Sequence, residues 1–180
     1  MFVAVLVALL LAPFGRRDVM EFAPSSPGSA PPGNDLTPDT VTVDARDPVK
    51  WRYVSFHRGG VLATGDTTGW DLAFRRFNVI ASGVIADAGP VYFDSLAEAP
   101  PAGYVATVAG RDTANAAIAR WYRYSFITHL LSPGDRVYVV RTVSGRFAKI
   151  QFLGYYCPGT APGCVTVRYA YQPNGSRALR

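Results

Sequence analysis

From residue 41 to the C-terminus, the chain is a succession of short runs in which apolar and polar side chains alternate, with turn-forming residues between the runs. Alternation with a period of two is typical of a β-strand that buries one face. The runs that alternate in this way, or that are rich in β-branched and aromatic residues, span residues 41–46, 51–56, 70–80, 121–127, 136–142, 147–156 and 165–172. Short strands at about ten-residue spacing predict an all-β, antiparallel domain, sandwich- or barrel-like, with at least seven strands.

Turn signals and one helix-like segment complete this outline. The pair Ser144-Gly145 lies between two apolar runs and predicts a β-hairpin. Residues 86–110 are rich in Pro and Gly, so we expect loops and one short strand there. Residues 112–120, DTANAAIAR, are rich in Ala and begin with two candidate N-cap residues. They predict at most one short helix in the domain.

The alternation also predicts which side chains form the core. Leu72 and Phe74 lie two residues apart and should share one face of a sheet, as should Ile150 and Phe152. The set that we expect to be mostly buried is Trp70, Leu72, Phe74, Val139, Ile150 and Phe152.

The first 40 residues have a different character. Residues 2–14 are 13 apolar residues in a row, fewer than the roughly 20 that span a bilayer, and they fit the h-region of a secretory signal. Arg16 and Arg17 follow this run and no basic residue precedes it, so a buried first helix or strand is the alternative. Residues 23–40 are dominated by Pro, Ser and Gly and bury too little surface to offset their ordering entropy. The predicted organisation is a signal or anchor segment at 1–22, a flexible spacer at 23–40 and a folded domain at 41–180.

The two cysteines of the chain, Cys157 and Cys164, bracket the sequence CPGTAPGC between two predicted strands. The Pro and Gly residues between them predict a turn, which places both thiols at the mouth of one hairpin. In an oxidising compartment the two thiols would form a disulfide. The alternative is a metal site, but two thiols without a local His are too few ligands.

Charge and motifs exclude several classes of function. The formal net charge is +5, but no run of Lys or Arg exceeds two residues, so a nucleic-acid surface is not indicated. The chain has no G-x-S-x-G, P-loop, G-x-G-x-x-G or H-E-x-x-H motif. Ser55 and His57 lie two residues apart, but no third group can be assigned to orient the imidazole, so a catalytic triad is unsupported. The sequence therefore favours a binding protein over an enzyme.

Two stretches in a fixed order carry a family resemblance. The first is WDLAFRRFN at residues 70–78, preceded by the aromatic strand WRYVSF at 51–56. The second is RVYVVRTVSGRFAKIQFLGYY at residues 136–156, followed by VTVRYAYQ at 165–172. Together they resemble the HmuY family of exported bacterial haem-binding proteins, over roughly residues 41–175. The resemblance implies an all-β fold, export to the periplasm, outer membrane or cell surface, haem as the ligand, and an outer-membrane receptor as the partner.

The same resemblance directs attention to the axial ligands of haem iron, which are residues such as His, Met, Cys or Tyr. In the haem-binding relatives, the ligands come from the variable middle of the chain and from the segment just before the VYVVRT stretch. Here residues 83–120 contain no His or Met, and His129 lies in the second segment, a few residues C-terminal of the family's ligand position. The other histidine is His57, at a predicted turn, where a structural role is the alternative. We expect Met1 and Met20 to lie outside the domain.

Aromatic residues cluster late in the chain and would suit a porphyrin or another flat apolar ligand. The alternative is that they form cross-strand pairs and the sheet core. The candidate pocket residues are Trp121, Tyr122, Tyr124 and Arg141, the last as a partner for propionates. The predicted function is haem binding and haem or iron acquisition, and the alternative is a cell-envelope interaction module of the same fold that binds no haem.

Overall fold

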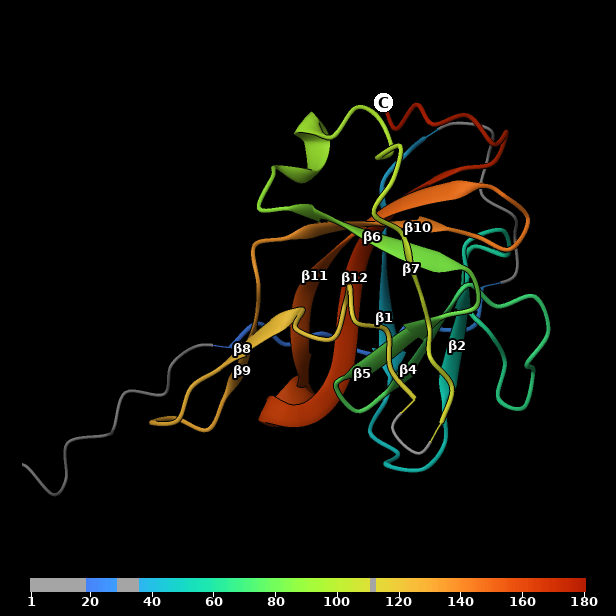
Figure 1. Cartoon of the computed structure of the whole chain (residues 1–180). Helices are drawn as coiled ribbons and strands as arrows, with labels where there is room; N and C mark the ends of the chain where they lie inside the picture. The colour runs from blue at the N-terminus through green and yellow to red at the C-terminus, as the bar shows by residue number, and fades with distance from the viewer. Residues whose placement is uncertain (1–18, 29–35, 111–112) are drawn as a thin grey trace, which may run out of the picture.

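The computed structural model describes residues 19–28, 36–110 and 113–180, and over these residues the protein is an antiparallel all-β domain (Figure 1). The strands are β1 (Asp39–Asp44), β2 (Arg52–Ser55), β3 (Gly60–Val61), β4 (Leu72–Arg75), β5 (Asn78–Ala81), β6 (Val84–Gly89), β7 (Val105–Ala106), β8 (Tyr122–Tyr124), β9 (Leu131–Pro133), β10 (Val137–Arg141), β11 (Phe147–Cys157) and β12 (Ala161–Gln172). The helical elements among these residues are two short 3-10 helices, η1 (Phe93–Ser95) and η2 (Pro158–Thr160). No helix in this part of the chain is long and apolar enough to cross a membrane. The predicted fold class is confirmed.

Two sheets pack face to face and enclose the main core. The larger sheet has six strands in the order β1-β12-β11-β10-β6-β7, and the smaller has four in the order β3-β2-β4-β5. Their inward side chains form one buried apolar cluster. Phe56, which follows β2, bridges the sheets by placing its ring centroid 5.2 Å from that of Tyr169 on β12. The arrangement is the predicted sandwich.

The predicted core is largely confirmed. The residues buried as predicted are Leu72, Phe74, Val139, Ile150 and Phe152. Trp70 is only half-buried. It lies just before β4 begins, outside the strand, and packs on Tyr53 with ring centroids 5.4 Å apart.

The outer face of the six-stranded sheet is covered as well. Val139 on β10 points away from the main core and packs with Leu179 near the C-terminus in a second cluster. Lys149 on β11 is buried there, and its ammonium group donates to the carbonyl oxygens of Phe93 (3.0 Å) and Leu96 (3.1 Å). Because both faces are covered, β10 is apolar without interruption instead of alternating.

Two predicted elements are wrong in detail. Residues 70–80, expected as one strand, form the β4–β5 hairpin, whose turn places Arg76 at a positive φ of 54°. The predicted helix at 112–120 is absent: residues 116–120 are a turn, and residue 112 lies outside the described residues. The buried Asn115 accounts for this, because its side chain accepts from the Ala117 N–H and donates to the Val105 carbonyl. Such local side-chain bonds compete with helix formation, which is marginal in so short a segment.

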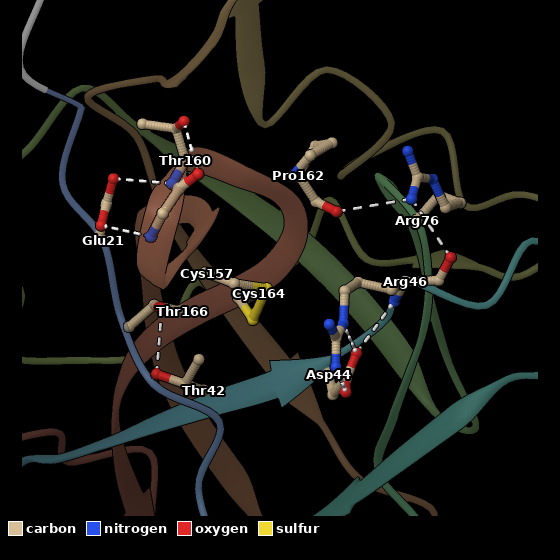
Figure 2. The surroundings of a disulfide bond; sticks show 11 residues. Glu21, Thr42, Asp44, Arg46, Arg76, Cys157, Thr160, Pro162, Cys164 and Thr166 are labelled. Atoms are coloured by element: carbon tan, nitrogen blue, oxygen red, sulfur yellow. Dashed lines mark hydrogen bonds and ion pairs between the residues drawn. A yellow bond between two sulfur atoms is a disulfide. The ribbon is translucent and has the colours of Figure 1, made fainter.

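The predicted disulfide is present in the structure. Cys157 and Cys164 are bonded, and they join the end of β11 to β12 across η2 (Figure 2). The hairpin at Ser144-Gly145 also forms where predicted, between β10 and β11.

An N-terminal strap, defined here as residues 19–28, lies along the body in an extended conformation. The Glu21 carboxylate accepts from the backbone N–H groups of Gly159 (2.9 Å) and Thr160 (2.8 Å), next to the disulfide (Figure 2). Phe22 covers Gly154 so closely that a Cβ at residue 154 would lie 2.7 Å from its ring. Part of the predicted spacer, together with the residues just before it, therefore packs on the domain.

The strap is held further along by backbone pairing. Ser25 exchanges hydrogen bonds with Thr42 of β1, and the Gly28 N–H donates to the Val61 carbonyl of β3. β1 itself begins at Asp39, so residues 39 and 40 belong to the larger sheet and not to a spacer. Residues 29–35 lie outside the described residues.

Candidate functional site

The β8–β9 hairpin projects from the sandwich on the side where β11 ends and β12 begins (Figure 1). Its two strands pair in antiparallel register, with Tyr124 opposite Leu131. The base is fixed to the body, because the Leu131 N–H donates to the hydroxyl of Tyr156 on β11 at 2.9 Å. Trp121, just before β8, stacks on Phe152 with ring centroids 4.3 Å apart. A rigid base thus carries a loop that extends into solvent.

His129 stands in this loop and contacts Tyr124. The Tyr124 hydroxyl lies 2.6 Å from His129 Nδ1. When Nδ1–H donates to the phenol oxygen, the proton is held on Nδ1 and the Nε2 lone pair is free to bind a metal. His129 itself is exposed and adopts a positive φ of 53°, an uncommon conformation for a non-glycine residue. The loop therefore presents an oriented imidazole to solvent.

Aromatic and apolar groups surround this imidazole. The Tyr124 ring lies 6.0 Å from the His129 ring and 5.1 Å from the ring of Phe126, centroid to centroid. Phe126 and the adjacent Ile127 are almost fully exposed. A flat apolar molecule could therefore lie against these rings within reach of the imidazole.

The structure separates the predicted pocket residues. Tyr124 lies beside His129, and Tyr122 lies on the same strand, partly buried against Phe77. Trp121 is buried, and its indole N–H donates to the Phe77 carbonyl, so it belongs to the core. Arg141 is exposed at the far end of β10.

His57 lies at the other end of the sandwich, in a hollow of about 730 Å³. The walls of this hollow include Arg146 and Val143 from the β10–β11 turn. That turn precedes β11, whereas the β8–β9 hairpin is tied to Tyr156 near its end. The nine residue-to-residue steps from 147 to 156 rise about 30 Å along the strand. His57 and His129 cannot ligate one iron in this fold.

Asp71 lies in the same hollow and is buried. Burial raises the pKa of its carboxyl group above the ordinary value, although the Phe56 N–H that donates to it and the nearby Ser55, His57 and Arg146 act in the opposite direction. Its role is to accept the backbone N–H at the end of β2. Within the part of the chain that the structure covers, no cluster of three or more His, Cys, Asp and Glu side chains could hold a metal ion.

One feature of the hairpin site was missed by sequence reasoning. Val19 and Met20 line a cleft of about 200 Å³ together with Leu131, Tyr155 and Tyr156, at the base of the hairpin. Met20 was expected outside the domain, but the strap places it against the body. Contacts between residues far apart in the sequence hold it there, such as the pairing of Glu21 with Tyr156, 135 positions later, and no local pattern indicates such a contact.

An antiparallel sandwich that presents an oriented imidazole among exposed rings is, as a class, a ligand-binding β domain. The sequence model of the family described as HmuY protein matches residues 47–169, and the chain belongs to the HmuY family. Members of this family are binding proteins of the haem-binding type. No curated protein matches the chain.

Solved structures agree with this assignment. A protein of Bacteroides vulgatus ATCC 8482, described as HmuY-like and heme-binding, is 21% identical, with a TM-score of 0.68 over 82% of this chain and 98% of that one. The apo HmuY analog of Tannerella forsythia is 18% identical, with a TM-score of 0.64 over 77% and 97%. A Bacteroides fragilis NCTC 9343 protein described as a lipoprotein is 19% identical, with a TM-score of 0.65 over 83% and 98%. At these identities the likeness establishes the fold.

Proposed function

We propose that this protein binds haem at the β8–β9 hairpin, with His129 as the axial ligand, and serves in haem or iron acquisition. The observation that carries the proposal is the 2.6 Å contact between the Tyr124 hydroxyl and His129 Nδ1. This contact holds the imidazole in one orientation and leaves Nε2 for iron. Membership of the HmuY family supports haem as the ligand.

Different residues of the hairpin have different roles in the proposed binding of haem. His129 supplies the nitrogen donor, Tyr124 orients it, and the rings of Tyr122 and Tyr124 offer apolar surface to the porphyrin. Haem itself supplies the iron and a strong absorption band that reports ligation. Because His57 lies at the opposite end of β11, this chain would provide His129 as its one histidine donor to a bound haem, and a tyrosinate or water would have to supply any second donor.

The setting of this function is the cell envelope. A likeness to a structure described as a lipoprotein and the disulfide Cys157–Cys164 both support an exported protein in the periplasm, outer membrane or cell surface. The apolar run at residues 2–14 would direct or anchor it, and an outer-membrane receptor would take the haem. Ligand transfer of this kind requires a site open to a second protein, and the exposed hairpin meets that requirement.

The test is a haemin titration of the full chain, followed by the Soret band. The parent should give a shifted band that saturates at one haem per chain, and His129→Ala should abolish the band or shift it to the blue. His57→Ala is the matched control and should leave the band unchanged. Tyr124→Phe should keep binding but weaken it, because the imidazole loses its orienting partner.

If His129→Ala and His57→Ala both bind haem like the parent, neither histidine is the ligand and the proposal fails. The alternative of an interaction module that binds no haem would then be favoured if the parent also shows no saturable Soret shift.

A further inference from the structure

The tip of the β8–β9 hairpin is apolar and fully presented to solvent. Phe126 is 84% exposed and Ile127 is 90% exposed. Across residues 19–28, 36–110 and 113–180, this is the one place where two consecutive large apolar side chains are both exposed. A contiguous apolar protrusion marks an interaction surface.

The hairpin segment itself carries charge of one sign. Residues 120–134 include Arg120 and Arg123 and contain no Asp or Glu. Both arginines are exposed. Apolar side chains that enter the acyl boundary, flanked by guanidinium groups that meet anionic headgroups, are the combination that binds a lipid surface. The charge bias therefore favours a lipid surface over the mixed charges of an ordinary protein partner.

The first residues of the N-terminal strap lie at the base of the β8–β9 hairpin. Val19 and Met20 lie at the base of the hairpin, in the cleft that includes residues 131–133, and Met20 is 66% exposed. The apolar run at residues 2–14 ends five residues before Val19, a reach of at most about 18 Å. If that run is held in a membrane, the hairpin is confined close to the surface, which raises its effective concentration there.

We propose that the β8–β9 hairpin docks on an anionic lipid surface, with Phe126 and Ile127 in the interfacial region and Arg120 and Arg123 at the headgroups. The docked hairpin fixes the orientation of the sandwich on the membrane. The proposal does not rest on haem binding, since neither Phe126 nor Ile127 is assigned to the iron.

The test uses the cysteine content of the chain. Both cysteines are in the disulfide, so an introduced cysteine is a unique site for an environment-sensitive fluorophore. Ile127→Cys places the label at the hairpin tip. Val143→Cys is the matched control, because Val143 is 77% exposed in the β10–β11 turn, at the opposite end of β11. The labelled full chains are mixed with vesicles of phosphatidylcholine and phosphatidylglycerol that carry a nitroxide-labelled lipid.

The label at residue 127 should shift to the blue and be quenched by the nitroxide at least several-fold more than the label at residue 143. Phe126→Asp in the Ile127→Cys protein should remove most of this difference, although residues 2–14 still associate with the vesicles. Replacing both Arg120 and Arg123 with Ser should reduce the quenching at residue 127 on anionic vesicles, and should have little effect on purely zwitterionic ones.

Equal quenching at residues 127 and 143 overturns the proposal. A blue shift at residue 127 without vesicles, growing with protein concentration, also overturns it and identifies a second copy of the chain as the occupant. His129→Ala should dock like the parent. Loss of haem binding and loss of docking are therefore separate results.

Discussion

The sandwich and the β8–β9 hairpin both contain packed aromatic side chains, but these are buried in the sandwich and exposed in the hairpin. Phe56 and Tyr169 are buried between the two sheets, with ring centroids 5.2 Å apart. In the hairpin, Tyr124 and Phe126 pack at 5.1 Å, but both are exposed. Aromatic content thus marks a core in one region and a binding surface in the other. What separates them is the presence or absence of an opposing sheet.

The comparison also separates stability from function. The sandwich contains the buried apolar clusters and the disulfide. Its side chains should therefore determine the free energy of unfolding. The hairpin is joined to the body at its base, and its tip contributes little buried area. Substitutions in the tip should therefore change binding and leave the fold intact.

The largest expected effect is in the core. Phe74→Ala should lower the free energy of unfolding by about 3–5 kcal/mol, because the ring is fully buried and its removal leaves a cavity. Phe126→Ala, at the exposed tip, should change it by less than about 0.5 kcal/mol. Urea unfolding of both variants against the parent measures the difference. A loss below about 1 kcal/mol for Phe74→Ala would show that the distinction between the two regions does not hold.

A smaller effect is expected at the disulfide. Replacing Cys157 and Cys164 with Ala should cost about 2–3 kcal/mol, because the bond closes a short loop of 7 residues in sequence separation. Labelling of the denatured, unreduced parent should find no free thiol. The strap should also become easier to detach, since its Glu21 anchor sites at Gly159 and Thr160 lie in that loop. Hydrogen exchange at Phe22 that is as slow as in the parent would contradict this coupling.

The smallest effect is a pH dependence at Asp71. Burial raises the pKa of this carboxyl in the folded state, so its protonated form is favoured by folding, and its contribution to stability is fully present below pH 3.8. That contribution is lost as the pH rises through the folded pKa. The stability of the parent relative to Asp71→Asn should therefore fall between pH 3.5 and pH 7.5.

Urea unfolding of the parent and of Asp71→Asn at both pH values measures this change. The opposite trend, with the parent gaining on the variant as the pH rises, would mean that the Phe56 N–H and the nearby Arg146 outweigh desolvation.

Much of the sandwich could be predicted from the sequence, because its determinants are local. Period-two alternation indicated Val41 and Val43 as inward residues of β1, and the Pro and Gly residues between Cys157 and Cys164 indicated the disulfide turn. The β4–β5 turn was missed because Arg76 occupies a left-handed position that usually selects glycine or asparagine.

Features that depend on distant contacts could not be predicted. The outer face of β10 is covered by residues near 96 and 179. The continuous apolar run of β10 predicts that both of its faces are buried, but it does not identify the residues that cover the outer one. Residues 23–28 of the strap are rich in Pro and Ser, so their sequence indicates a spacer. The strap is held by Tyr156, the disulfide loop, Thr42 and Val61, none of which is close to it in the sequence.

The candidate site was predicted in part. His129 was identified through its position before VYVVRT, and Tyr124 as an aromatic neighbour, but their contact depends on how the loop turns between β8 and β9. Separation of His57 from His129 follows from the length of β11, which no spacing in the sequence reveals.

The order of strands has a consequence for when the domain can form. β12, the last strand to be synthesised, lies between β1 and β11, and Asp39 pairs with Tyr169, 130 residues later. A nascent chain that has emerged only to residue 160 has no partner for β1 and no complete larger sheet. Pairings over such long separations are slow to close. The larger sheet therefore cannot be complete until β12 has been synthesised and has left the ribosome.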